Sequence, residues 1–240
     1  MPRSRDALEE AAPPFAAPDR QSGHRERLRA RFLLGGPEAM PDYELLELVL
    51  FAAIPRRDVK ALAKQLIVRF GSFADAIAAP RERLLEVEGI GGNAVTQLKV
   101  IEAAALRLSR SRLIGKPALN SWTAVLDYCT AAMARGTREE FRVLFLDRKN
   151  VLIADEVQST GTVDHTPVYP REIVRRALEV GASAMVLVHN HPSGDPTPSR
   201  ADIEMTRRIA GAANPLGIAV HDHVVVGRSG HASFKSLGLL

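Results

Sequence analysis

Cysteine and long apolar runs are what this chain conspicuously lacks. Cys129 is the one cysteine among 240 residues, which excludes an intrachain disulfide and a cysteine-rich zinc module. No stretch approaches the roughly 18 apolar residues that a membrane helix needs. The first residues also lack the apolar segment of a signal peptide. We therefore expect a cytoplasmic protein without membrane contact.

An excess of charge of either sign is also missing. The chain has 32 Lys and Arg against 28 Asp and Glu, a formal net charge of +4. This small surplus gives only weak support for nucleic-acid binding. Hydrophobic residues make up 46% and charged residues 25% of the chain, as in an ordinary globular protein with a sizeable core. The composition leaves the oligomeric state open.

The apolar pattern changes once along the chain, near residues 115–117. Residues 1–24 have no periodicity and are predicted to form a disordered tail. Residues 25–112 repeat apolar residues at helical spacing, which predicts a small all-α domain. Residues 117–240 intersperse strand and helix patterns. The fold class predicted for them is α/β (or α+β), with a central mixed sheet flanked by helices.

Cap and turn residues set the limits of the predicted elements. Asp42 is expected to cap an amphipathic helix that starts at Tyr43. Other helices are predicted over Val59–Phe70, Ala124–Met133, Pro170–Val180 and Arg200–Ala213. Strands are predicted over Phe141–Leu146, Val151–Val157, Ala184–Val188, Ile218–Val226 and Ala232–Phe234.

Two histidines, His189 and His191, follow the predicted strand Ala184–Val188. Alternate residues of a strand face the same side, so both imidazoles can point at one spot beyond its end. A Pro-rich loop then leads to Asp202, which can supply an oxygen. Two nitrogens and one carboxylate with an open position are typical of a catalytic zinc site. The alternative is a polar turn followed by a capping pattern, with Ser199 as N-cap and Asp202 three positions on.

Three other polar residues are weaker metal candidates. Asp195 competes with Asp202 but follows His191 by only four residues in the proline-rich loop. His221 and His223 alternate on a predicted strand, so they can share a face, as outer-shell groups or as a separate metal site. Hydrogen-bonded edge or core positions are the more common role of such residues.

The spacing His189-x-His191-Pro192, followed by Ser199-x-x-Asp202, resembles the JAMM motif of MPN-type metalloproteases, which cleave peptide or isopeptide bonds. From about Arg25 to its end, the chain is similar to bacterial RadC-like (UPF0758) proteins. This similarity depends on the run from His189 to Pro196, Gly161-Thr162, Pro170-Arg171-Glu172 and Asp222-His223. It implies an MPN-like fold, one Zn²⁺ per chain held by His189, His191 and Asp202, an oxyanion contact from Ser199, and a peptide or protein substrate.

The resemblance also implies a general base. Glu139 matches the glutamate that activates the metal-bound water in these enzymes, with Glu140 and Glu156 as alternatives. Other JAMM enzymes usually have a small residue and a later glycine after this glutamate. Here Arg142 and Leu146 occupy those places, so the base is less firmly assigned than the ligands.

A glycine-rich turn in the helical region, Gly89-Ile90-Gly91-Gly92, resembles a helix–hairpin–helix element. Gly89 and Gly91 permit positive φ and a close backbone approach. The N–H groups at the start of the next helix can hold a phosphate, and Lys99 can add a cation. DNA contact of this kind would be independent of sequence and sensitive to salt. The alternative is a helical hairpin that serves only packing or protein contacts.

The sequence thus favours a zinc metallopeptidase of unspecified substrate. A DNA-associated protein, with the second domain as a scaffold, is the main alternative. A zinc nuclease is less favoured because no carboxylate cluster for two metal ions is present.

Overall fold

The computed structural model of the chain describes residues 20–113, 115–118, 122–161 and 168–240. By their internal contacts these residues form two compact units. The first contains the described residues up to Ala76 with Leu85–Gln97, and the second contains Ile77–Leu84 with Leu98–Leu240. The division falls inside one helix, α6 (Gly92–Ser111), whereas the sequence pattern changes near residues 115–117.

The amino-terminal part of the chain is built from short helices. They are α1 (Arg20–Gly35), η1 (Pro37–Ala39), α2 (Asp42–Ala53), α3 (Lys60–Phe70), α4 (Phe73–Ala78) and α5 (Arg81–Leu85). Residues 20–24, predicted as part of the tail, belong to α1, and residues 1–19 lie outside the described residues. The next residue, Arg25, donates to the carbonyl oxygens of Ile54 and Arg57 at 2.8 and 2.7 Å. These contacts with a distant segment help explain why local composition failed to predict the start of the helix.

Asp42 does not cap α2 as predicted. Pro41 occupies the cap position without a side-chain hydrogen bond, and Asp42 is the first helical residue. Its Oδ2 accepts a 2.7 Å hydrogen bond from the backbone N–H of Phe73, at the start of α4. The carboxylate still places negative charge in the first turn of α2, which favours a helix start there.

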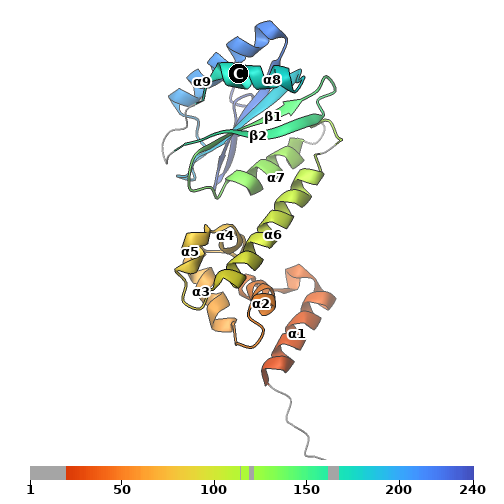
Figure 1. Cartoon of the computed structure of the whole chain (residues 1–240), viewed down its shortest axis with the longest axis vertical. Coiled ribbons are helices and arrows are strands. Elements are labelled where there is room, and N and C mark those ends of the chain that lie inside the picture. Colours follow the sequence, from red (N-terminus) through yellow and green to blue (C-terminus); the bar gives the residue numbers. More distant parts are fainter. Residues whose placement is uncertain (1–19, 114, 119–121, 162–167) are drawn as a thin grey trace, which may run out of the picture. The chain divides into compact units, whose positions relative to one another are not determined.

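A five-stranded mixed sheet forms the centre of the carboxyl-terminal unit (Figure 1). Its strands are β1 (Glu140–Leu146), β2 (Leu152–Thr160), β3 (Ala184–Asn190), β4 (Ala219–Gly227) and β5 (Gly230–Ser233). The order is β2-β1-β3-β4-β5; β3 and β4 are parallel, and the other neighbours are antiparallel. The predicted mixed sheet is confirmed.

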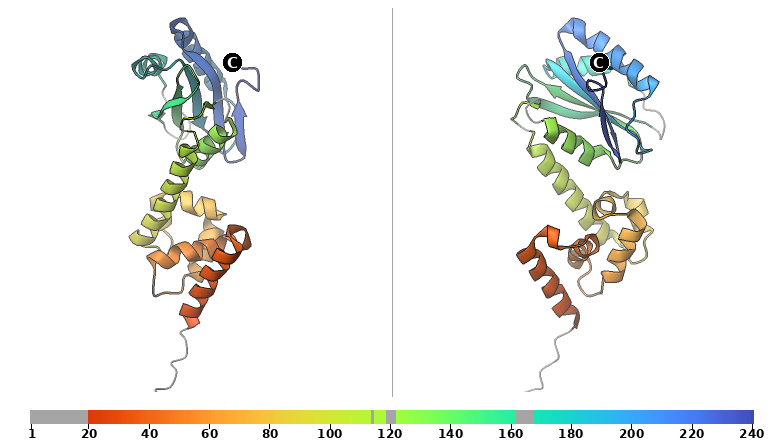
Figure 2. Two further views of the ribbon diagram at one scale, coloured as in Figure 1. Left: turned by 90° about the vertical axis from the view of Figure 1, so that its right-hand side faces the viewer. Right: turned by 180° about the vertical axis from the view of Figure 1, so that it is seen from behind.

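Helices cover both faces of this sheet, so β3 is buried at every residue (Figure 2). The helix α7 (Trp122–Met133) packs on one face, where Val186 and Val188 of β3 point. The opposite face, with Leu187, is covered by α8 (Pro170–Glu179) and α9 (Arg200–Ala213), which η3 (Asn214–Leu216) follows. Burial on both sides explains the unbroken apolar run of β3.

Length alone would allow α6 to cross a bilayer. Its 20 residues span about 30 Å. Charged residues interrupt its apolar sequence, however: Lys99, Glu102, Arg107 and Arg110. Within the described ranges, no helix is both long and apolar enough to span a membrane.

Candidate metal centre

His189 belongs to β3, which is two residues longer than predicted and ends at Asn190. The strand continues because β1 and β4 both pair with it this far: Phe141 and Val225 lie opposite His189. The backbone N–H of His191 extends the ladder with a 2.9 Å bond to the Val226 carbonyl oxygen. His189 therefore lies within the strand, and only His191 lies beyond its end.

The loop after His191 is fixed to β4. Gly194 accepts hydrogen bonds from the N–H and the hydroxyl of Ser229, at 3.3 and 2.9 Å. A Cβ at Gly227 would overlap the Gly194 carbonyl oxygen, so this close approach requires a glycine. Anchoring the loop in this way also positions Asp195, whose carbonyl oxygen lies 2.8 Å from His191 Nδ1.

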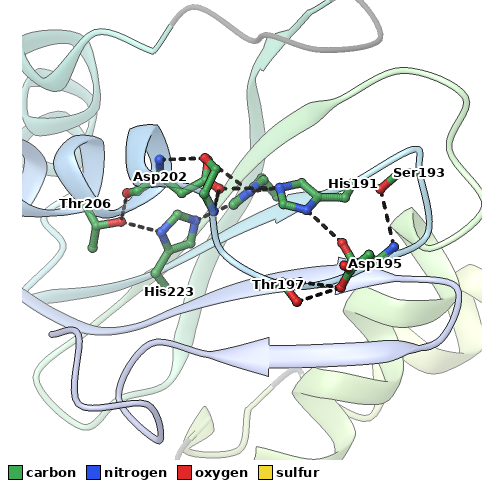
Figure 3. A network of polar contacts seen from close by, with 9 residues as sticks. His191, Ser193, Asp195, Thr197, Asp202, Thr206 and His223 are labelled. Atoms are coloured by element: carbon green, nitrogen blue, oxygen red, sulfur yellow. Dashed lines mark hydrogen bonds and ion pairs between the residues drawn. The ribbon is translucent and has the colours of Figure 1, made fainter.

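Asp195 itself does not join the group of candidate ligands. Its Oδ1 accepts from the N–H and the hydroxyl of Thr197 at 2.9 and 2.7 Å, as Figure 3 shows. The Thr197 hydroxyl bond is the main reason that the pKa of Asp195 is lowered. Its backbone carbonyl contacts His191, so Asp195 acts on the site through its main chain.

Asp202 approaches the histidines from the first turn of α9. Ser199 caps this helix: its Oγ accepts from the N–H of Asp202 at 3.2 Å, and Asp202 Oδ2 accepts from the N–H of Ser199 at 2.7 Å. The alternative capping interpretation is therefore also correct. It does not compete with metal binding, because the same carboxylate also faces both imidazoles.

The side chains of His189, His191 and Asp202 converge between the end of β3 and the start of α9. His189 Nε2 lies 3.0 Å from His191 Nε2, and each of these nitrogens lies 3.4 Å from an oxygen of Asp202. Ligand atoms about 2.0–2.1 Å from one tetrahedral ion lie roughly 3.3 Å apart. The side chain of His189 is 1% exposed, those of His191 and Asp202 19% and 15%. The group therefore fits a metal ion with one position open to solvent.

The contacts of His191 and Asp202 determine which ring nitrogen of His191 carries a hydrogen and how the pKa of each group is shifted. A carbonyl oxygen only accepts, so His191 Nδ1 carries a proton toward Asp195. In the neutral ring, Nε2 of His191 then carries no hydrogen, and its lone pair is directed at His189 Nε2 and the Asp202 carboxylate. Only a protonated Nε2 can donate to Asp202; this bond favours the charged ring and raises the pKa of His191, and the charge of Glu139 adds to the rise. Burial alone would raise the pKa of Asp202, but both histidines together hold it far below its usual range. These shifts are those of a site built to hold positive charge.

Of the three candidate bases, Glu139 is the one whose charge acts on a candidate ligand, His191. It directly precedes β1, whose second residue, Phe141, pairs with His189. Its charge contributes to the raised pKa of His191. Its carbonyl oxygen accepts a 2.8 Å bond from Gly161, while Thr162, the partner of Gly161 in the motif, lies outside the described residues.

Glu140 and Glu156 each form an ion pair with an arginine. Glu140 Oε1 lies 2.9 Å from Arg142, which also binds Asp155 at 2.7 Å. Glu156 on β2 accepts a bidentate pair from Arg176 of α8, at 2.6 and 2.9 Å. That bond lowers the pKa of Glu156.

Asn190, between the two histidines, holds the segment that carries Glu139. Its Oδ1 accepts from the backbone N–H of Glu140 at 2.8 Å, and its Nδ2 donates to the carbonyl oxygen of Arg138 at 3.0 Å. The amide therefore bonds the backbone on both sides of Glu139 and ties it to β3. Sequence reasoning missed this role, since an Asn in a His-x-His motif has no local signal for a partner about fifty residues away.

His221 and His223 are both hydrogen-bonded, which is the role that the sequence favoured for them, and they do not share a face. β4 has one extra residue opposite β3, at His221, and such a bulge breaks the alternation of side chains. His221 Nε2 lies 2.6 Å from Asn150 Oδ1. His223 Nε2 instead lies 2.8 Å from His189 Nδ1, directly behind the candidate ligand. Sequence reasoning also missed Thr206, whose hydroxyl contacts His223 at 2.6 Å.

The glycine turn of the helical region lies between α5 and α6 in the chain. Gly89 has φ 91°, and the Arg57 guanidinium packs against it, while nothing lies near an added Cβ at Gly91. Lys99 lies about 10 Å along α6 from its start. Its amine bonds the Ile77 carbonyl oxygen at 3.1 Å and Glu102 at 2.8 Å. DNA-phosphate contact at this turn stays a prediction from the sequence.

The mixed sheet between two helical layers, with a His-x-His strand end facing an aspartate at the next helix start, defines a JAB (MPN-type) domain. Residues 119–239 match the RadC-like JAB domain family. A UPF0758 protein of Rhodobacter capsulatus is 63% identical over 213 residues, which cover 89% of this chain and 100% of that protein. The chain therefore belongs to the RadC-like (UPF0758) family. The JAB domain and the His-His-Asp group support a metal-dependent hydrolase.

Proposed function

We propose that this protein is a zinc metallopeptidase that hydrolyses a peptide or isopeptide bond. The observation that carries the proposal is the convergence of His189 Nε2, His191 Nε2 and the Asp202 carboxylate. The charge of Glu139 also acts on His191, which supports a place for Glu139 at the site. Two imidazoles and one carboxylate are a donor set that suits zinc. The ion would act as a Lewis acid that polarises the scissile carbonyl and lowers the pKa of water.

The protein's own residues would divide the remaining work. Glu139 is the proposed general base: it would accept a proton from the attacking water and pass it to the leaving amine. Asn190 would support this step by holding the backbone of Glu139 against β3. The exposed side of His191 and Asp202 leaves room for the substrate carbonyl to approach.

Ser199 is the proposed donor to the oxyanion. Its Oγ uses an acceptor site to cap α9, so the hydroxyl proton remains to be donated. We expect Ser199→Ala to lower kcat by roughly 10²–10³-fold, as loss of an oxyanion donor does. It should also destabilise the unit by about 1 kcal/mol through loss of the cap. Ser199→Thr, which keeps the hydroxyl, is the control; equal losses in both variants would contradict the role.

Turnover of a peptide library tests the function itself. The native chain should cleave members of an unbiased library of peptides and branched isopeptides, measured by mass spectrometry. A chelator should stop cleavage, and added zinc should restore it, because the metal supplies the Lewis acid. Cleavage that persists after complete removal of metal would refute the proposal.

A further inference from the structure

A buried chain of hydrogen bonds runs behind the candidate ligand His189. His189 Nδ1 lies 2.8 Å from His223 Nε2, and His223 Nδ1 lies 2.6 Å from the Thr206 hydroxyl. That hydroxyl lies 2.6 Å from the backbone carbonyl oxygen of Asp202. His189, His223 and Thr206 are each 1% exposed. Figure 3 shows His223 and Thr206 linked in this way beside Asp202. The chain therefore begins at the main chain of one ligand and ends at the ring of another.

The direction of every bond in this chain follows from its acceptor end. The Asp202 carbonyl oxygen can only accept, so the Thr206 hydroxyl donates to it. The hydroxyl has one proton, so it must accept from His223, and His223 Nδ1 therefore carries a hydrogen. No other arrangement satisfies both contacts of the hydroxyl.

The direction of the hydrogen bond between His223 and His189 follows because the His223 ring is neutral. It is enclosed by the rings of Phe141 and Phe234, with centroids 5.6 and 4.6 Å away, and neither ring nitrogen bonds a carboxylate. A buried charge without such a partner is costly. With Nδ1 protonated, Nε2 of the neutral ring is an acceptor, and His189 Nδ1 must supply the hydrogen.

We propose that His223 and Thr206 are positioning residues that hold His189 in the Nδ1–H tautomer, with the Nε2 lone pair directed at the metal position. The proposal rests on the proposed metal site. Ligating histidines generally donate their other ring hydrogen to an outer-shell acceptor that fixes tautomer and orientation. Here a second histidine is that acceptor, and a threonine fixes the second histidine in turn. The opposite direction would place a hydrogen on His189 Nε2, facing His191 and Asp202, and would obstruct binding.

Thr206→Val tests the chain with little change of shape. Zinc affinity, measured by competition with a chromophoric chelator, should fall about 10- to 100-fold, as it does when outer-shell partners are lost. Thr206→Ser, which keeps the hydroxyl, should bind zinc as the native chain does. Thr96→Val is the matched control, because the Thr96 hydroxyl makes the same bond to the carbonyl four residues earlier, at 2.9 Å on α6. It should leave the affinity unchanged.

The tautomer gives a second readout that needs no metal. Nitrogen NMR of the metal-free native chain, labelled at histidine, should show His189 protonated at Nδ1, and Thr206→Val should shift this ring toward a mixture of tautomers. If Thr206→Val does not fold, Thr206→Ala replaces it. A native chain that binds no zinc but shows this tautomer would refute the proposed function and leave the relay standing. Unchanged affinity and tautomer in the Thr206 variant, or an Nε2–H ring in the native chain, would overturn the relay.

Discussion

Glu139→Gln is expected to lower kcat by about 10²–10⁴-fold, the usual contribution of a positioned general base, while zinc binding stays intact. Glutamine keeps the size and polarity of the side chain but does not accept a proton at neutral pH. The Glu139 carboxylate is not among the three candidate ligands, so the metal content should not change. The measurement is single-substrate turnover on a peptide found by library profiling, with zinc determined in the same samples.

Glu140→Gln is the matched control for this experiment. It makes the same chemical change one residue away, on a glutamate that pairs with Arg142 and is not among the charges that raise the pKa of His191. Its backbone N–H, which Asn190 binds, is unaffected by the substitution. We expect turnover close to that of the native chain. A large loss in Glu140→Gln together with normal turnover in Glu139→Gln would move the base to Glu140 and contradict the assignment.

A chain with both His189→Ala and His191→Ala is expected to lose specific zinc binding and all hydrolysis. One carboxylate then remains of three protein ligands. Zinc at 100 times its dissociation constant stabilises a binding fold by about 2.7 kcal/mol, which corresponds to roughly 5–10 °C in Tm for a chain of this size. The native chain should show this rise in thermal scans, and the double variant should not.

His221→Ala serves as the histidine control in these scans. His221 bonds Asn150 and lies outside the ligand group, so the zinc-dependent rise in Tm should persist. The rise in the native chain should also shrink as the pH is lowered, because the pKa of His191 is raised by its hydrogen bond to Asp202 and protons then compete with the metal for this imidazole. A double variant with native zinc stabilisation, or with hydrolytic activity, would refute the ligand assignment.

The sequence was informative about the ligands because their signal is local. His189 and His191 follow a strand, and Asp202 opens the next helix. The mixed sheet followed from the interspersed strand and helix patterns and is confirmed. Local patterns contain no information about which distant backbone group a side chain will meet. The Asp42 side chain therefore bonds the start of α4 and does not cap its own helix.

The roles of the residues around the candidate ligands could not be predicted from the sequence, because they depend on contacts between distant segments. Glu139 was predicted as the base only by resemblance, since its place beside the candidate ligands depends on the pairing of β1 with β3 at Phe141. Asn190 and Thr206 act through partners that the sequence does not mark. A bulge in β4 separated His221 from His223, and the residues after it are all buried, so the sequence has no alternation there in which the shift could be read.

X-ray diffraction at the zinc absorption edge tests the central claim most directly. Crystals of the native chain, grown with one equivalent of zinc, should give one strong anomalous peak about 2.0–2.2 Å from His189 Nε2, His191 Nε2 and an Asp202 carboxylate oxygen. The peak should be absent in the double histidine variant. A native crystal with no anomalous density among these three side chains, or with its zinc bound elsewhere, would contradict the account.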